Sequence, residues 1–460
     1  MKRQICNCIR LSVIDFVFLF CVATGIVFAQ EGKVVSSYGP TNQDVSFEQI
    51  KAGRMAVKAE RAKQHKDLLN SRYDLSKKTS KDIYMSGGKT IPEGPTANLH
   101  GISWEQLNNM TPAQIKEKGI FPYKPLPFPD HAEGGMLFPE MITKLLLRLV
   151  RFDIDFDLPE YVLPDPFPAL YLTTRPDLGD IAKGRLITID NYYEIFNGIL
   201  NPKQLEGLRL LVTQFPQQQF NATEDRRTDR PSLGVTCFDC HANGHTNGAT
   251  HLVGDIRPQE FRHRIETTTL RGVSIQQLFG SQRAMKTVED FTEFEQRAAY
   301  FDGDICMAVK KGVNVLERGS QVQYMAEFLA ILDFPPAPKL NIYGKLDQAQ
   351  ATPSELRGES LFNGKAQCAS CHPAPYYTDN SMHDLKAERF YKMELDNGMM
   401  MAHDGNIKTF PLRGIKDSPP YMHDGRCFTL EDIVEYFNLI QQLHLSSEEK
   451  KDIVAFMRTL

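Results

Sequence analysis

The sequence predicts a mainly α-helical protein in which two related domains in tandem follow an N-terminal extension of mostly irregular and helical structure. Three observations support this fold class. They are two pentapeptides of the pattern C-x-x-C-H, a longer repeat that surrounds them, and helix-capping signals at matching places in both copies. A length of 460 residues is enough for two or three domains with separate cores.

The two pentapeptides indicate covalently attached haem. Two thiols three residues apart can each form a thioether with a haem vinyl group, and the adjacent histidine then faces the iron. A zinc knuckle would need four clustered ligands, but after His372 the next Cys or His is His383. The sequence therefore predicts two c-type haems with His241 and His372 as proximal ligands. The attachment residues are Cys237, Cys240, His241, Cys368, Cys371 and His372.

The repeat extends well beyond the pentapeptides. The segments 269–273 (TLRGV) and 287–290 (TVED) recur as 411–415 (PLRGI) and 429–432 (TLED), and both pairs share one offset along the chain. The pentapeptides recur at a slightly smaller offset, so the stretch from haem motif to LRG motif is longer in the second copy. A shared register over several motifs indicates two homologous cytochrome c-like haem domains.

Helix signals place the domain boundaries. Thr352 to Glu355 forms a capping box with proline at the first helical position, and it opens a helix that continues through Leu361 and Phe362. Ser446 to Glu449 is a second capping box ahead of a helical apolar pattern, and 322–332 repeats that pattern in the first copy. Because the prolines at 335–338 break the chain, we expect haem domains at 201–338 and 339–460.

The N-terminal part carries no haem motif. Residues 1–29 combine basic residues, an apolar run and a small-residue cleavage pattern, which predicts a secretory signal peptide and a periplasmic protein. An uncleaved membrane anchor is the alternative, because the run is about as long as a short membrane span. In the extension, 30–200, we expect 145–150 to belong to a buried helix. A net charge of −4 gives no bias toward nucleic acid.

Two cysteines remain after the signal peptide and the haem motifs are removed. Cys306 and Cys427 could form a disulfide in an oxidising compartment, or could be two buried thiols. The sequence leaves both alternatives open.

The block 410–432 (FPLRGIKDSPPYMHDGRCFTLED) resembles the C-terminal haem domain of bacterial di-haem cytochrome c peroxidases and their MauG-type relatives. The motifs C-x-x-C-H, LRG, Y-x-H-D-G and T-L-E-D follow in family order over roughly 200–460. The resemblance implies that the haem on His241 reacts with hydrogen peroxide. The haem on His372 would take electrons from a small donor protein, a cytochrome c or a cupredoxin. It also implies a homodimer, and calcium bound partly through the main-chain oxygens of Ser418 and Pro420.

The sequence departs from the family on the distal sides of the irons. The second haem's sixth ligand is expected fourteen residues past His423, which is Phe437, next to Tyr436. Other residues weighed as that ligand are Met382, His383, Met393, Met399, Met400, Met401 and His403. The family's inter-haem tryptophan is replaced, since the corresponding pair reads Phe279-Gly280 and the only tryptophan is Trp104.

The peroxide side is equally altered. The family's distal histidine would fall at 257, which is arginine, so His251 is the candidate, with His245 also near. For the family's glutamate, Glu289 aligns with Glu431 of the other copy and suggests a structural part, which leaves Glu293 and Glu295 as catalytic candidates. Arg271 and Arg413 hold matching positions and are expected to pair with haem propionates.

Three functions follow as hypotheses. The first is a periplasmic di-haem peroxidase that reduces hydrogen peroxide to water. The second is a MauG-type oxidase that acts on a protein or organic substrate, which the missing tryptophan and altered sixth ligand favour. The third is an electron-transfer cytochrome with both irons six-coordinate.

Overall fold

The computed structural model describes residues 47–127, 136–150, 158–214, 236–253, 263–280, 283–294, 318–393, 395–396, 399–400 and 405–460. The predicted signal peptide lies outside the described residues, and so do Cys306, Glu295, Met401 and His403.

Helices dominate the described part of the chain, as the sequence predicts. They are α2 (Phe47–Arg72), α3 (Trp104–Asn108), α4 (Pro112–Lys118), α5 (Glu140–Leu145), α6 (Tyr192–Phe196), α7 (Pro202–Leu211), α8 (Cys237–Cys240), α9 (Val288–Phe294), α11 (Gln323–Leu329), α12 (Pro353–Asn363), α13 (Leu430–Ile440) and α14 (Ser447–Met457).

The strands are short and were not predicted. They are β1 (Thr79–Tyr84), β2 (Thr90–Pro92), β3 (Met136–Leu137), β4 (Tyr171–Leu172), β5 (Thr250–Val253), β6 (His263–Glu266), β7 (Leu332–Asp333), β8 (Met382–Asp384), β9 (Leu395–Asp396), β10 (Met399–Met400) and β11 (Asn406–Lys408). They form small antiparallel pairs and one three-stranded sheet in the order β3-β5-β6. The sheet β3-β5-β6 and the pair β4-β7 join the extension to the first repeat copy.

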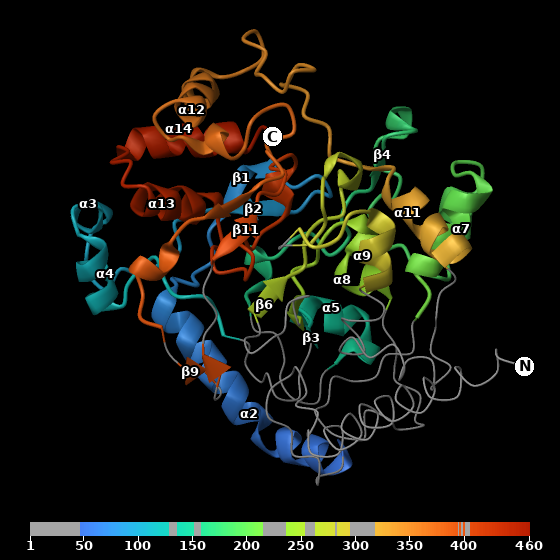
Figure 1. Ribbon diagram of the computed structural model, residues 1–460, viewed down its shortest axis with the longest axis horizontal. Coiled ribbons are helices and arrows are strands. Elements are labelled where there is room, and N and C mark those ends of the chain that lie inside the picture. The colour runs from blue at the N-terminus through green and yellow to red at the C-terminus, as the bar shows by residue number, and fades with distance from the viewer. Residues whose placement is uncertain are drawn as a thin grey trace, which may run out of the picture.

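Each repeat copy is closed by a pair of crossing helices. α7 packs against α11 in the first copy, and α12 packs against α14 in the second. Figure 1 shows these pairs on opposite sides of the molecule, with α12 and α14 beside α13. The two predicted capping boxes of the second copy are present, because Thr352 and Ser446 each accept a hydrogen bond from the backbone N–H three residues on.

Both crossings depend on a glycine. A Cβ added to Gly207 of α7 would lie 1.9 Å from the carbonyl oxygen of Tyr324, and one added to Gly358 of α12 would lie 1.9 Å from that of Asp452. The backbones therefore touch in a way that no side chain would permit. The shared glycine contact extends the repeat from sequence motifs to helix packing.

The LRG motifs adopt the same conformation in both copies. Gly272 and Gly414 have φ of +71° and +74°, and each backbone N–H binds a carbonyl beyond its closing helix, that of Leu332 or Leu460. The hairpins that follow are equivalent, since the bridges Phe279↔Met285 and Tyr421↔Cys427 lie at the same offset as the LRG motifs. The TVED and TLED segments then cap α9 and α13 through Asp290 and Asp432.

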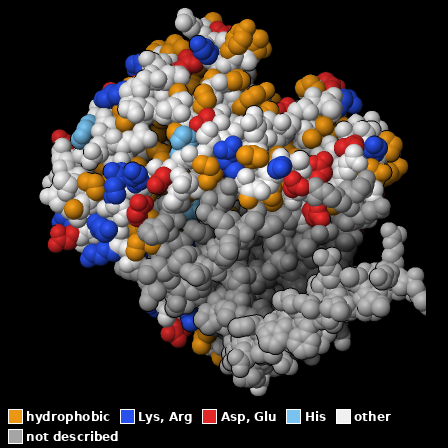
Figure 2. All heavy atoms as spheres, viewed as in Figure 1, with side chains coloured by type: hydrophobic (Ala, Val, Ile, Leu, Met, Phe, Trp, Pro, Cys, Tyr) orange, Lys and Arg blue, Asp and Glu red, His pale blue; other side chains and the backbone are white. Residues whose placement is uncertain are grey.

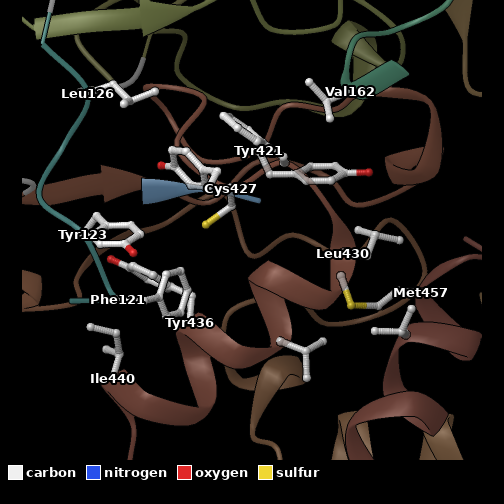
Figure 3. Close-up of a cluster of buried hydrophobic side chains, with 14 of the residues drawn as sticks. Phe121, Tyr123, Leu126, Val162, Tyr421, Cys427, Leu430, Tyr436, Ile440 and Met457 are labelled. Carbon is white, nitrogen blue, oxygen red and sulfur yellow. The ribbon is translucent and has the colours of Figure 1, made fainter. Parts of the chain in front are cut away.

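The extension packs along both copies and contributes to two hydrophobic cores, one shared mainly with the second copy and one with the first. Tyr73 donates a hydrogen bond to the carbonyl of Arg426, and the Thr96 hydroxyl donates one to the buried carboxylate of Asp432. Trp104 packs edge-on against Phe121, whose ring in turn meets Tyr436 of α13. Figure 3 shows Cys427 amid this aromatic cluster, and Cys427 is fully buried.

The prediction of a buried helix at 145–150 was wrong. α5 ends at Leu145, a 3₁₀ turn follows at Leu147–Leu149, and Leu145, Leu147 and Val150 are exposed, Leu147 by 76%. Because α5 ends at Leu145, the apolar residues of this run do not share one helical face. Ile142 and Leu149 are buried, and Met141 and Leu146 pack partly buried against the core.

The described surface carries charges of both signs. Figure 2 shows basic and acidic side chains interspersed with apolar ones over the visible described face. None of the described helices is both long and apolar enough to span a membrane.

Candidate haem sites

The first histidine, His241, is held by the segment before the LRG motif. α8 contains Cys237 and Cys240 and ends at His241, whose Nδ1 lies 2.9 Å from the carbonyl oxygen of Thr268. Because a carbonyl oxygen can only accept, Nδ1 carries the proton and Nε2 keeps its lone pair. Burial lowers the pKa of His241 to about 4, so the ring is neutral at physiological pH.

The second histidine, His372, has the same arrangement with a different partner. Its Nδ1 donates to the carbonyl oxygen of Tyr377 at 2.8 Å, and the Tyr377 hydroxyl donates to the carbonyl of Gly344. Burial lowers the pKa of His372, while carbonyls of Tyr377 and Phe410 oppose that shift. Each pentapeptide thus presents a neutral imidazole with Nε2 available to an iron, which fits haem c.

The thiols fit haem attachment better than a zinc site. Burial raises the pKa of Cys368 to about 12 and also raises the pKa of Cys371, so both are protonated thiols, the form that adds to a haem vinyl group. The described residues contain no cluster of three or more Cys, His, Asp or Glu side chains suited to a metal ion.

The surroundings of the two motifs differ in exposure. Phe238, Asp239, Cys240 and Ala242 are all less than 5% exposed, and Arg148 of the extension pairs with Asp239 through two contacts of 2.7 and 2.5 Å. In the second motif the loop around His372 lies at the surface. Its exposed members are Gln367, Ser370, Ala374, Pro375 and Tyr376.

Arg271 of the first LRG motif lies in a buried network that joins all three parts of the chain. Its guanidinium binds the carboxylate of Asp417 at 2.9 Å and the carbonyl of Ala169 at 2.5 Å. Burial alone would raise the pKa of Asp417, but Arg271 and neighbouring donors lower it below its usual range. A propionate contact for Arg271 stays a prediction, since this arginine already has a carboxylate partner.

His245 belongs to the same network. Its Nε2 donates to the carbonyl of Asp417 at 2.9 Å, so Nδ1 accepts from the hydroxyl of Thr269 at 2.8 Å. Burial and Arg271 lower the pKa of His245 to about 3. With both ring nitrogens bonded, His245 has no lone pair left for a metal.

Arg413 of the second LRG motif has no carboxylate partner among the described residues. It donates to the carbonyls of Leu460 at 3.3 Å and Pro335 at 3.2 Å, and its guanidinium lies 5.6 Å from the centre of the Phe334 ring. Burial lowers its pKa. The propionate contact predicted for Arg413 remains open.

The catalytic candidates are placed only in part. Glu293 lies half-buried on α9, and His251 lies on β5 opposite Met136 and Ile265, with its side chain outside the described part. Their catalytic parts, and that of Glu295, stay predictions.

The region of the predicted sixth ligand is packed with aromatic side chains. Tyr436 is 1% exposed, and the Arg426 guanidinium lies 5.6 Å from its ring centre, while Phe437 is half-buried beside it. His383 binds the Asp379 carboxylate through Nε2 at 2.7 Å, which occupies that nitrogen. Met382 and Met393 are half-buried, and the sixth ligand stays unassigned.

The buried acid Glu266 was not predicted from the sequence. Glu266 ends β6 and is 7% exposed, its carboxylate accepts from the Thr246 hydroxyl at 2.8 Å, and burial raises its pKa well above the ordinary value. A Cβ added to Gly425 would lie 3.0 Å from Cγ of Pro420 and 3.7 Å from Cγ of Glu266, so both side chains face this glycine. The strand pattern could have suggested the position, but nothing in the sequence distinguishes this buried glutamate from an exposed one.

The helical fold and the anchored histidine beside each cysteine pair fit the class of haem c proteins. The resemblance to MauG and the bacterial di-haem cytochrome c peroxidases is confirmed by curated relatives at modest identity. The methylamine utilization protein MauG of Methylorubrum extorquens is 33% identical over 132 residues, which are 25% of this chain and 36% of that protein. A cytochrome-c peroxidase of a Pseudomonas species is 29% identical over 173 residues, 30% of this chain and 47% of that protein.

The chain thus aligns with between about a third and a half of the length of these relatives. No protein-family model matches the sequence. Among solved structures, a MauG-like protein associated with microbial copper homeostasis is 18% identical with a TM-score of 0.39, covering 66% of this chain and 94% of that one.

Proposed function

We propose that this chain is a periplasmic di-haem cytochrome c peroxidase that reduces hydrogen peroxide to water with electrons from a small donor protein. The observation that carries the proposal is the pair of neutral, carbonyl-anchored histidines, His241 and His372, each beside two cysteines and set in contrasting surroundings. Haem c held there would supply an iron that changes oxidation state. The reaction balances as H₂O₂ plus two electrons and two protons giving two waters.

The contrast in exposure supports a division of labour. The first motif is enclosed by the extension, which keeps bulk water away from the site. Such a site suits the peroxide-reacting haem proposed on His241. A motif at the surface suits electron entry from a donor, because a donor can dock near it. Two haem domains at 201–338 and 339–460, closed by the α7/α11 and α12/α14 pairs, would hold these two functions apart.

Proton delivery falls to the carboxyl groups and the distal histidine. Glu293, Glu295 and His251 are the candidates, and each would move a proton between peroxide oxygens as the O–O bond breaks. Arg271 and Arg413, one in each LRG turn, would bind the haem propionates. His241 and His372 each keep the Nδ1–H hydrogen-bonded to a backbone carbonyl throughout the reaction. This hydrogen bond fixes the orientation of each imidazole ring.

Calcium would bind between the halves through the main-chain oxygens of Ser418 and Pro420. Glu266 and Pro420 both face Gly425, and a cation bound near the buried Glu266 carboxyl would lower the pKa that burial raises. Export by the signal peptide and assembly as a homodimer complete the proposal.

A MauG-type oxidase is the second candidate. The pair Phe279-Gly280 stands where the family has its tryptophan, and Phe437 cannot ligate iron. Either departure could turn electron supply away from a donor protein and toward oxidation of a bound substrate.

One experiment separates these functions. The half-reduced holoprotein is examined by optical and EPR spectroscopy, then mixed with hydrogen peroxide in the presence of a reduced small cytochrome. A high-spin haem with rapid oxidation of the cytochrome is the expected result. A peroxide reaction without cytochrome turnover would favour the oxidase, and two low-spin haems that do not react would leave an electron carrier.

A further inference from the structure

Lys408 is a buried cation with no acidic partner among the described residues. It ends β11 and is 2% exposed, and its ammonium group donates to Gln276 Oε1 at 3.0 Å and to the carbonyl of Leu278 at 2.8 Å. Both acceptors are neutral, and among the described residues no carboxylate pairs with Lys408. A buried ammonium group without a counter-charge is strongly unfavourable, so such lysines are normally paired.

A second cation lies close to the first. The guanidinium of Arg283 is near enough to add to burial in lowering the pKa of Lys408, to about 8. Arg283 Nε is buried and has no hydrogen-bond partner among the described residues. Two cations with unused donors therefore converge on the hairpin that starts at Phe279.

The position of Lys408 connects the two halves. Its acceptors Gln276 and Leu278 follow the first LRG motif, and the ammonium lies 5.6 Å from the Phe279 ring centre and 5.3 Å from that of Phe410. The backbone of Phe410 reaches the imidazole of His372. Asn380 adds a second link, because its side chain accepts from the N–H of Gln277 at 3.0 Å.

The unmatched charge has the sign that haem c would neutralise. Each haem c carries propionate groups, and a carboxylate pairs best with a desolvated ammonium or guanidinium. Arg271 already has a carboxylate partner in Asp417, whereas Lys408 has only neutral acceptors among the described residues. We propose that Lys408, assisted by Arg283, binds a propionate of the haem attached at Cys368 and Cys371. This inference rests on the proposed di-haem function.

Charge at a propionate changes the reduction potential of the iron. A cation that neutralises the carboxylate favours the reduced haem, so its removal stabilises the ferric state and makes the potential more negative. Lys408 would therefore raise the potential of the electron-entry haem, at the place where relatives carry tryptophan.

The test is a spectroelectrochemical titration of both haems in the holoprotein, without peroxide or donor. Lys408→Met should shift the equilibrium of one haem toward the oxidised form by roughly tenfold, which is ~59 mV for one electron. Lys408→Arg should retain the wild-type potential, and Arg283→Met should give a smaller shift of the same sign. Lys451→Met is the matched control, because Lys451 is 75% exposed on α14.

The outcomes are separable. Unchanged potentials in Lys408→Met overturn the proposal, even if the variant is less stable, because a purely packing lysine would not move a potential. Should Lys408→Met yield no holoprotein, Lys408→Gln is compared with Lys408→Arg, and equal potentials in those two overturn it. Loss of the proposed peroxidase function would instead appear as absent peroxide turnover in the wild type, whatever the potentials.

Discussion

The two repeat copies share what holds a proximal histidine and differ in what surrounds it. Both have a glycine-mediated helix crossing, a left-handed LRG glycine, an aspartate-capped helix and an Nδ1–H bound to a carbonyl. Around His241 the chain is enclosed by the extension, whereas around His372 it is exposed. The shared scaffold therefore orients each proposed proximal histidine, and the surroundings distinguish the functions proposed for the two haems.

A pair of buried charges sharpens this contrast. Glu266 and Lys408 are separated by the same offset as the two LRG motifs, and each ends a strand of its copy. The first copy thus buries an acid where the second buries a base. An acid in one copy and a base at the equivalent position of the other would give the two proposed haems different electrostatic surroundings.

The largest expected effect comes from removing one attachment site. Cys237→Ser with Cys240→Ser, or Cys368→Ser with Cys371→Ser, should each leave one haem per chain, as a haemochrome assay measures. Under the proposed function the first pair abolishes reaction with peroxide, and the second abolishes donor-supported turnover. Full turnover in the second double variant would contradict the division of labour.

The two LRG arginines should differ in stability effect. Arg271→Met leaves Asp417 buried without its partner and should lower the free energy of unfolding by about 3–5 kcal/mol. Arg413→Met loses hydrogen bonds to carbonyls and the contact with the Phe334 ring, but leaves no buried carboxylate unpaired, and should cost roughly 1 kcal/mol. Urea unfolding measures both. Adding Asp417→Asn to Arg271→Met should restore part of the loss, and equal effects of the two single variants would break the contrast.

The two helix crossings should respond alike. Gly207→Ala and Gly358→Ala each place a methyl group against a backbone carbonyl and should destabilise the protein by about 1–3 kcal/mol. Gly53→Ala on the exposed face of α2 has open space and should instead stabilise by roughly 0.5–1 kcal/mol. Thermal melts of the three variants measure these effects as changes in Tm. An unchanged Tm in Gly207→Ala would show that α7 and α11 pack less closely than α12 and α14.

The smallest expected effect is the part of the pH dependence that His245 contributes. The folded pKa of His245, about 3, lies below its unfolded value of about 6.5, so the unfolded state binds more protons between these values. Stability should therefore decrease as the pH is lowered, by roughly 1 kcal/mol between pH 6.5 and 5.5. His245→Gln should flatten that slope in urea titrations. The same slope in wild type and variant would show that His245 is not the titrating group.

Local signals predicted much of the scaffold. Thr352 and Ser446 open helices where their capping boxes indicate, and Val322, Met325 and Leu329 are buried as the periodic pattern suggests. These features depend on residues a few positions apart. The short strands were missed because such brief pairings depend on partners far along the chain.

The sequence predicted the attachment residues of the site, but not the features that depend on contacts between residues far apart in the chain. The C-x-x-C-H motif orders cysteine and histidine by itself, but the partner of each Nδ1, Thr268 or Tyr377, could not be read from spacing. Neither could the pairing of Arg271 with Asp417, far apart in the chain, nor the burial of Glu266 and Lys408. The sequence alone does not tell whether a charged side chain is buried or exposed to water.

The glycine crossings also have a consequence for the order of events as the chain is made. Each C-x-x-C-H segment lies inside a long loop that closes only when α11 meets α7 or α14 meets α12, well after the motif itself has been synthesised. Closing so long a loop is slow relative to local helix formation. If haem c is attached at both motifs, as proposed, the cysteines of each copy would stay accessible until its last helix arrives, and the first copy could close before the second is synthesised.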